Sequence, residues 1–181
     1  MGESINLINE FKVDNVIFNI GDYNDLELDL IKILNNENIN YYQNIESLNL
    51  GNKKLYFLNT KDFNDENENS SVIYTEIEDI KILFMGDAGV KKEKAILEKY
   101  KLTDIDILKV GHHGSDTSSS NNFIDVISPK NCLISLGKNN IYGHHKESVL
   151  ETLNKCNIYR TDLNGSIKIQ LNKLEIKTCV P

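Results

Sequence analysis

The feature that most constrains this chain is a set of three short apolar runs, each followed by a loop that contains glycine and polar residues. Runs of this length, rich in aliphatic and β-branched side chains, are typical of buried strands. Loops at strand ends are where functional sites gather on α/β sheets, so the polar clusters indicate a candidate site. The runs are residues 82–85, 105–110 and 131–136, and the polar clusters that follow them are residues 86–87, 111–115 and 137–145.

Helical and strand patterns fill the rest of the chain. Apolar residues at helical spacing predict a helix that begins after a cap at Asp22 or Asn24 and ends near Asn36. The segments on either side of Glu78 and Asp79 predict an antiparallel hairpin. Further helices are predicted over residues 91–101, 119–128 and 146–156. Further strands are predicted over residues 14–22, 39–45, 53–59 and 157–162, with a hairpin over residues 165–178.

The order of these elements predicts an α/β fold with α+β layers, in which a sheet packs against helices. Strands pair locally in the middle of the chain and alternate with helices elsewhere. With 181 residues, no internal repeat and no linker-like segment, the chain is expected to form a single domain.

The net charge of −7 constrains what the chain can bind. Proteins that hold nucleic acid by electrostatics carry a basic face, because contacts with phosphates dominate their affinity. The acidic balance therefore argues against strong, metal-free binding of nucleic acid. It leaves open a site whose positive charge comes from bound metal ions.

Cysteine usage and hydropathy bear on where the chain resides. Cys132, Cys156 and Cys179 are odd in number and form no CxxC pair, so we interpret them as small apolar core residues rather than disulfide partners or metal ligands. No run approaches the roughly 20 apolar residues that span a bilayer, so no membrane segment is expected. The N-terminus lacks the basic and apolar regions of a signal peptide, and a soluble chain is expected.

All four histidines lie in two of the loops that follow strands, as the pairs His112–His113 and His144–His145. Asp87 follows a third strand. An aspartate and two histidines from separate strand ends form a metal-ligand set, because neutral imidazole is the commonest metal ligand. Adjacent residues that leave a strand point to opposite sides, so at most one of His112 and His113 is expected to face a given pocket.

Each of these residues also has a purely structural interpretation. Asp87 is suited to cap a helix that begins near Val90, and histidines are common in turns. Ser115 lies in HHGSD and not in the G-x-S-x-G turn that presents a serine nucleophile, so it is interpreted as a turn residue. The glycine patterns that cradle nucleotide phosphates are absent, which leaves nucleotide binding unsupported.

Four segments, in the same order, resemble the metallo-β-lactamase-fold hydrolases. They are most similar to the metallo-hydrolase domain of ComEC-type DNA-internalisation competence proteins. The resemblance extends from Met1 to about Ile169 and implies the C-terminal portion of an αββα sandwich that binds two metal ions, usually zinc, with manganese as an alternative. The segments are ILFMGDAG, DIDILKVGHHGSDTSSSNNFI, PKNCLISLGKNNIYGHHKESVLETL and IYRTDLNGSIKI.

The resemblance implies roles for individual residues. Asp87 matches the aspartate that bridges the two metals, and His112 with His113 matches a histidine motif at the metal site. These three are therefore the expected catalytic residues as well as metal ligands. His144 matches a family histidine on the last loop of the site and is the fourth expected ligand. The residues expected to support the site are Asn140, Tyr142 and Ser115.

One departure from the family is large. The leading motif H-x-H-x-D-H and the strand before it are absent, and the first residues resemble the stretch that follows that motif. Residues 1–181 are therefore expected to form a single partial domain that lacks the N-terminal strands. Met1 is accordingly expected to be an internal methionine of a longer protein. His145 stands where the family usually has proline, so it is assigned no role.

Two functions follow from this resemblance. The first is a metal-dependent hydrolase of the phosphodiesterase or nuclease type, which acts on a phosphoester or nucleic acid once the missing N-terminal half is present. The second is a catalytically inactive truncated remnant, or a partner-dependent half of a split metallo-hydrolase. Because the absent motif supplies most ligands of one metal, the isolated chain is expected to be inactive. The resemblance leaves the compartment open, since the intact parent can be extracellular or membrane-tethered.

Overall fold

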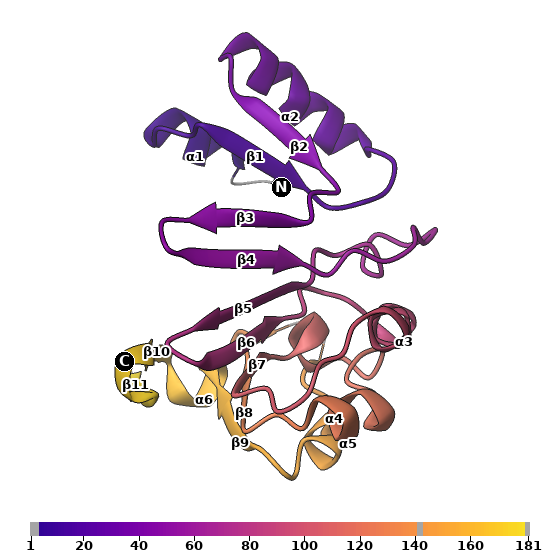
Figure 1. Cartoon of the computed structure of the whole chain (residues 1–181), viewed down its shortest axis with the longest axis vertical. Coiled ribbons are helices and arrows are strands. Elements are labelled where there is room, and N and C mark those ends of the chain that lie inside the picture. The colour runs from indigo at the N-terminus through magenta and orange to yellow at the C-terminus, as the bar shows by residue number, and fades with distance from the viewer. Residues whose placement is uncertain (1–3, 141–142, 180–181) are drawn as a thin grey trace.

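The computed structural model describes residues 4–140 and 143–179 of the chain. Its centre is a seven-stranded sheet whose strands lie side by side in the order in which they occur in the sequence (Figure 1). The strands are β3 (Ser47–Leu50), β4 (Lys53–Phe57), β5 (Ile73–Ile77), β6 (Ile80–Phe84), β7 (Ile107–Lys109), β8 (Asn131–Ile134) and β9 (Asn157–Arg160).

Strand direction changes in the middle of this sheet. β3 to β6 pair antiparallel, whereas β6 to β9 pair parallel. The predicted hairpin of β5 and β6 is confirmed, and Glu78 and Asp79 adopt the positive φ angles, 52° and 64°, that suit a two-residue turn. Parallel neighbours need a crossover. The three crossovers contain α3 (Val90–Lys99), α4 (Asn121–Ile127) and α5 (Glu147–Thr152).

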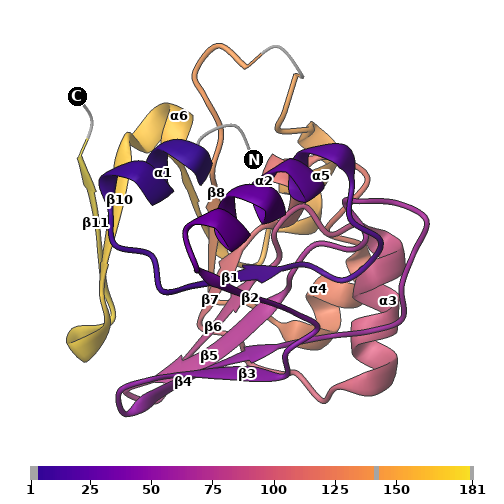
Figure 2. The ribbon, with the colours of Figure 1, turned by 90° about the horizontal axis from the view of Figure 1, so that it is seen from above.

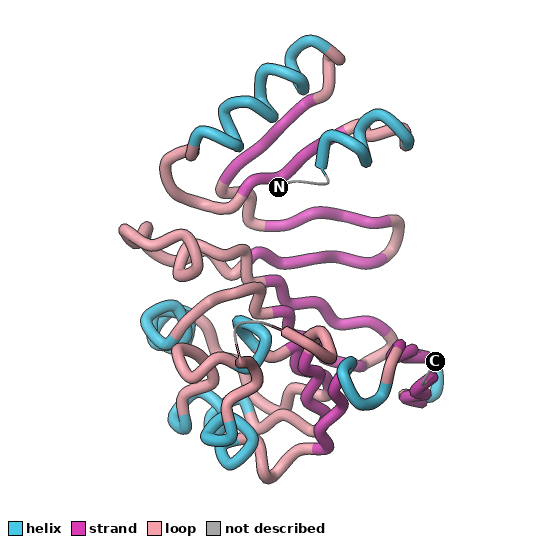
Figure 3. Tube along the Cα trace, turned by 180° about the vertical axis from the view of Figure 1, so that it is seen from behind, coloured by secondary structure: helices cyan, strands magenta, loops and turns pink. Residues whose placement is uncertain are grey.

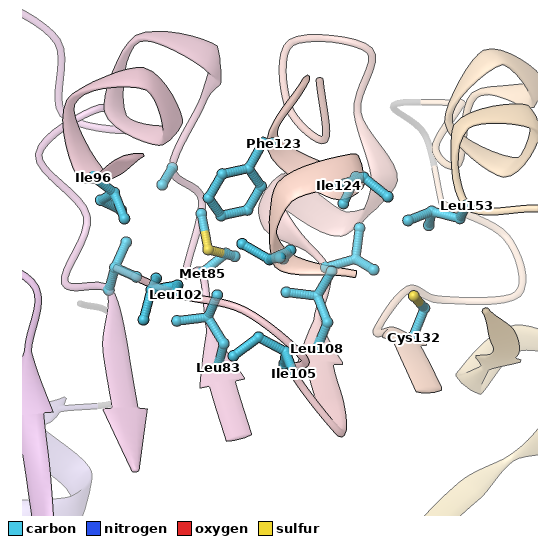
Figure 4. Packing of buried hydrophobic residues seen from close by; sticks show 14 of the residues in the cluster. Leu83, Met85, Ile96, Leu102, Ile105, Leu108, Phe123, Ile124, Cys132 and Leu153 are labelled. Carbon is cyan, nitrogen blue, oxygen red and sulfur yellow. The ribbon is translucent and has the colours of Figure 1, made fainter. Parts of the chain in front are cut away.

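The crossover helices cover one face of the sheet and enclose the main core (Figure 2). Leu83 and Leu108 from the strands meet Ile96, Phe123 and Leu153 from the helices, and all five are buried. Figure 4 shows these side chains packed between the two layers. Complete burial of one such side chain contributes about 1.5–3 kcal/mol, so this layer stabilises the packing of the helices on the parallel half.

The opposite face of the sheet is only partly covered (Figure 2). An antiparallel hairpin of β10 (Ser166–Gln170) and β11 (Glu175–Cys179), predicted from the sequence and confirmed, packs Ile169 there. Its contacts are with Ile82 and Ile107. Phe84, two residues further along β6 on the same face, remains 41% exposed. Apolar surface is thus left beside the C-terminal end of β6.

The N-terminal residues form a separate small layer beyond edge strand β3 (Figure 3). β1 (Asn15–Phe18) and β2 (Asn40–Gln43) pair in parallel through the crossover helix α2 (Asp25–Asn36), and α1 (Ser4–Glu10) lies against α2. Phe18, Leu30 and Leu34 form its core. This unit lies at one end of the molecule, away from the β9 edge of the main sheet.

A capping box decides where α2 begins. The side chain of Asn24 accepts a hydrogen bond from the Glu27 backbone N–H at 3.0 Å, and the Glu27 carboxylate accepts one from the Asn24 N–H at 2.9 Å. Two backbone donors that the helix leaves unpaired are satisfied in this way. Of the two predicted caps, Asn24 is therefore the correct one.

The sequence prediction is correct for the mixed α/β content and the central sheet, and it misses three short elements. These are α1, β3 and α6 (Thr161–Asn164). The strand predicted over residues 157–162 ends at Arg160, because Thr161 begins α6 and its hydroxyl donates to the Leu136 carbonyl at 2.7 Å. Within the described ranges, every helix is too short or too polar to cross a membrane.

The interpretation of the three cysteines as small core residues without a disulfide is wrong, because two of them are bonded to each other and the third, Cys179, is exposed. Cys132 and Cys156 form a disulfide, with Cα atoms 6.1 Å apart, that joins β8 to the segment after α5. Cys132 is buried as expected, so the bridge is also part of the core. The sequence gives no sign of the pair, because the parallel pairing of β8 with β9 is what brings the two residues together. Cys179 is an exposed thiol.

Removal of this disulfide should destabilise the fold. The bond closes a loop with a sequence separation of 24 residues, and the loss of unfolded-state entropy predicts a stabilisation of about 3 kcal/mol. We expect the Cys132→Ala/Cys156→Ala double variant to lose roughly that free energy of unfolding in urea titrations. Cys179→Ala is the matched control and should unfold like the wild type. Equal stability of the double variant and the wild type under oxidising conditions would contradict the assignment.

Candidate functional site

The parallel pairing of β6, β7 and β8 brings the predicted polar loops to one edge of the sheet. Because the carboxyl ends of parallel strands point the same way, the loops that carry Asp87, His112 and His113 emerge side by side. A backbone hydrogen bond from the His112 N–H to the Gly86 carbonyl, 3.1 Å long, joins the first two loops directly. The expected gathering of these loops is therefore present.

A tight turn after β7 presents the histidine pair. His112 (φ 43°) and His113 (φ 54°) both occupy the left-handed region, which non-glycine residues adopt rarely. Backbone conformations of this kind cluster at functional sites. The turn sits close to its neighbours, because a Cβ atom added at Gly111 would lie 2.9 Å from the Ala88 carbonyl oxygen. Glycine is therefore required at the start of this turn.

His113 lies opposite Asp87. Its Nδ1 is 2.6 Å from the carbonyl oxygen of Ser135, which can only accept, so Nδ1 carries the proton. The Nε2 atom, on the other side of the ring, lies 3.5 Å from Asp87 Oδ1. Two acceptor atoms this close are stabilised by a proton or a cation between them. The hydrogen bond to the Ser135 carbonyl fixes the orientation of the His113 ring, as such bonds do for histidines that bind metals.

His112 pairs with His144 instead. The two ring centroids are 5.5 Å apart, and His112 Nδ1 lies 3.2 Å from the Thr117 hydroxyl. Burial lowers the pKa of His144, and the neighbouring charges of His112 and Lys146 lower it further. The lowered pKa favours the neutral form of the His144 ring, which is the form that binds metals. As expected, the two adjacent histidines, His112 and His113, meet different partners.

The loop that carries His144 is folded around Asn140. The Asn140 side chain accepts from the His144 backbone N–H at 2.8 Å and donates to the His144 carbonyl at 2.6 Å. A supporting role for Asn140 is consistent with this clamp. Tyr142, the other residue expected to support this loop, lies outside the described residues.

An ion pair that sequence reasoning missed braces the same loop from β9. Arg160 makes a bidentate contact with Asp162 and approaches His145 Nε2 at 3.2 Å. The backbone is close here too, because a Cβ atom added at Gly114 would lie 2.9 Å from His145 Cβ. His145, which was assigned no role, thus connects the Arg160–Asp162 pair to the histidine turn.

Asp87 does not cap the helix that follows it. The N-cap of α3 is Gly89, which makes no side-chain hydrogen bond, and the Glu68 carboxylate accepts from the Lys92 backbone N–H at 2.7 Å instead. The Asp87 N–H donates to Ser70 Oγ at 3.2 Å. The capping interpretation of Asp87 is therefore wrong, and its carboxylate is left to face His113.

Ser115 and Glu93 shape the loop after the histidine turn. Ser115 is buried, and its hydroxyl lies 3.0 Å from Thr117 Oγ1, the same oxygen that His112 contacts. Glu93 on α3 is buried and accepts from the backbone N–H groups of Ser119 and Ser120. Burial raises the pKa of Glu93 despite these hydrogen bonds. The sequence analysis does not predict that Glu93 holds this loop, because a glutamate in an amphipathic helical pattern is usually exposed to solvent.

Lys109 adds a cation close to the candidate ligands. It occupies the last position of β7, and its ammonium group donates to the Val110 carbonyl at 2.8 Å. Burial lowers the pKa of Lys109, whereas the negative charge of Asp87 raises it. The carboxylate that faces His113 therefore also acts on a partly buried lysine.

The candidate metal ligands form two pairs rather than one compact cluster. Across residues 4–140 and 143–179, no three histidine, cysteine, aspartate or glutamate side chains lie close enough together to hold a metal ion. Protein zinc sites use three ligands with an open position, or four without one. The described arrangement thus presents oriented ligands in numbers that fall short of a complete site.

Comparison with known proteins gives relatives over part of the chain. No family model matches. ComE operon protein 3 of Bacillus subtilis (strain 168) is 37% identical over 105 residues, which cover 57% of this chain and 14% of that protein. Competence protein ComA of Neisseria gonorrhoeae is 34% identical over 116 residues, 62% of this chain and 17% of the relative. Recombination protein 2 of Haemophilus influenzae is 33% identical over 116 residues, which cover 62% of this chain and 14% of that protein. The chain is therefore homologous to competence proteins and matches only a small part of their length.

The ion pair that braces the His144 loop should make stability depend on pH. The hydrogen bond from Arg160 lowers the pKa of Asp162 in the folded state. The ionised Asp162 therefore contributes fully to the free energy of unfolding when the pH is above the unfolded-state pKa of about 3.9. This contribution is lost as the pH falls through the lower pKa of Asp162 in the folded state. We expect Asp162→Asn to reduce the free energy of unfolding by about 1–3 kcal/mol at pH 7, and by less below about pH 4.

Urea unfolding at both pH values measures this difference. Asp125→Asn is the matched control, because the Asp125–Lys155 pair is exposed and should contribute less than about 1 kcal/mol. A loss for Asp162→Asn that stayed constant down to pH 3 would show that the charge of Asp162 is not what stabilises the loop.

Proposed function

We propose that this chain is part of a metal-dependent hydrolase of the metallo-β-lactamase superfamily, of the phosphodiesterase or nuclease type. The observation that carries the proposal is the approach of His113 Nε2 to Asp87 Oδ1, at 3.5 Å, with the proton of the ring held on the other nitrogen by Ser135. An imidazole nitrogen and a carboxylate oxygen that converge in this way are suited to bind a divalent cation.

The residues present fit a metal centre in part. Asp87 with His113, and His112 with His144, would each provide two ligands to zinc, or to manganese as an alternative. Such an ion lowers the pKa of bound water and stabilises negative charge on a phosphoryl group. The protein residues orient the ligands: Ser135 holds His113, Thr117 holds His112, and Asn140 holds the backbone of His144.

We propose that the remaining ligands come from another polypeptide segment, of the kind that carries an H-x-H-x-D-H motif. Two pairs fall short of the ligand number that a catalytic zinc site needs. The sheet face beside Asp87 supports this proposal, since Phe84 is 41% exposed there. Among the described strands, β1 pairs only with β2, so its other edge is open to a further strand.

Nucleic acid is the substrate class that we favour. The chain is homologous to competence proteins. Its resemblance to the DNA-internalisation members of that group implies contact with a phosphodiester backbone. The net charge of −7 opposes that contact, so bound cations and local basic groups such as Lys109 would have to attract the phosphates.

The second candidate is a half-site that cannot act alone. The distribution of the four residues as two pairs, with no three side chains grouped in the described ranges, favours this alternative for the isolated chain. The two candidates share the same residues and differ in whether a second segment is present.

Metal binding tests which residues hold the ion. We expect the isolated chain to bind zinc weakly, with fewer than two ions per chain. Asp87→Ala should weaken the remaining binding by at least about tenfold, because it removes the anionic ligand. Ser115→Ala should leave it nearly unchanged, because that hydroxyl contacts Thr117. Titration calorimetry and metal analysis after gel filtration measure both quantities. Two tightly held ions per chain, or the reverse ranking of the variants, would contradict the proposal.

Hydrolysis tests the requirement for a second segment. The isolated chain should be inactive on bis-p-nitrophenyl phosphate and on single-stranded DNA with zinc or manganese. Activity should appear when the chain is fused behind a segment with the H-x-H-x-D-H motif, and a fusion with alanines in that motif is the control. Chelator-sensitive activity from the isolated chain, abolished by His113→Ala, would show that these residues form a sufficient site.

A further inference from the structure

A large cavity of the described chain lies away from the histidine turn. It has a volume of about 820 Å³ and lies between strands β4 and β5 and the C-terminal end of α3. We call it the β4 groove. Its lining includes none of the candidate metal ligands. The residues on which its chemistry depends are Lys54, Tyr56, Tyr74, Lys99, Tyr100 and Lys101.

Aromatic rings form one wall of the β4 groove. Tyr56 and Tyr74 are paired neighbours on β4 and β5, with ring centroids 6.2 Å apart and planes tilted by 39°. Tyr56 is 42% exposed, so part of its ring is accessible to solvent. Burial and a hydrogen bond to Glu76 raise the pKa of Tyr74 to about 12, so this ring stays uncharged. Flat, neutral and accessible rings are suited to stacking.

Lysines give the groove a positive charge that the rest of the chain lacks. Four lysines and two glutamates line it, and one of the lysines, Lys53, is paired with Glu78 at 2.7 Å, whereas the whole chain carries a net charge of −7. The Lys54 ammonium lies 5.0 Å from the centre of the Tyr56 ring, so a cation and a ring are presented together. Lys101 is exposed at the far side of the cavity.

The groove is also held in shape. Tyr100 Oη and Lys99 Nζ both donate to the Asn59 carbonyl, at 2.7 Å and 2.8 Å, and thereby join α3 to the segment after β4. Asn59 Nδ2 donates in turn to the Ile45 carbonyl at 2.7 Å. Preformed walls lower the entropy cost of binding, because the contact residues are already ordered.

We propose that the β4 groove binds single-stranded nucleic acid, with a base stacked on Tyr56 and the flanking phosphates close to Lys54 and Lys101. Aromatic rings beside basic groups are how proteins hold single strands without reading their sequence. A duplex keeps its bases stacked on one another and cannot offer them to a tyrosine. The inference rests on the proposed function for its class of ligand, and it adds a strand-binding site that is separate from the metal ligands.

Fluorescence anisotropy with a labelled ten-nucleotide oligothymidine, in buffer with EDTA, tests the proposal on the full chain. The absence of metal separates this result from the hydrolase proposal, because the groove should bind even if the candidate metal site is inactive. Tyr56→Ala should weaken binding about tenfold, which is the size expected for one stacked base. Lys54→Glu/Lys101→Glu should weaken it by at least as much, and affinity should fall with salt.

Two controls match these variants. Tyr42→Ala removes an exposed tyrosine of β2, and Lys94→Glu reverses an exposed lysine of α3 outside the groove. Both should bind like the wild type, and circular dichroism should show that all variants are folded. Absence of binding by the wild type, equal loss in the control variants, or equal affinity for a duplex of the same length would overturn the proposal.

Discussion

The parallel ladder of β6, β7 and β8 is the constraint on which the other features depend. Leu83 and Leu108 are buried against the helices, and this burial sets the register of the strands. Because side chains alternate along a strand, a slip of one residue would move the apolar set to the opposite face. The same register fixes where the strands end, and therefore where Asp87 and the histidine turn meet. The core and the candidate site are thus two results of one packing arrangement.

The sequence predicts those elements whose formation depends on residues that are close together in the chain. Apolar runs, the cap at Asn24 and the Glu78–Asp79 turn predict elements that the structure contains, since each depends on neighbouring residues. Partners that are distant in the sequence were not predictable. The disulfide is one case, and the support of His145 by Arg160 is another, because both need the pairing of β8 with β9. The sequence identifies Asp87 and the loop histidines as candidate ligands, whereas their arrangement in two pairs depends on the three-dimensional fold.

The protein holds potential cation and anion sites in different parts of an acidic chain. At the strand ends, the hydrogen bond of His113 to Ser135 directs the other ring nitrogen toward Asp87, and this arrangement suits a cation. In the β4 groove, lysines lie beside exposed rings, and this arrangement suits an anionic strand. A phosphodiester needs both kinds of contact, because its charge must be neutralised at the reacting group and its chain must be held elsewhere. Net charge alone would not reveal either site.

The Cys132–Cys156 bond has a topological consequence for the loop between β8 and α5. It closes a covalent ring that contains the end of β8, Asn140, His144 and α5. A protease that cleaves one peptide bond in the exposed residues 137–139 opens the ring without dividing the molecule. The disulfide bond still joins the two fragments, and His144 remains beside His112. Only reduction would then release the C-terminal fragment, so cleavage of this loop and loss of the histidine are separate events.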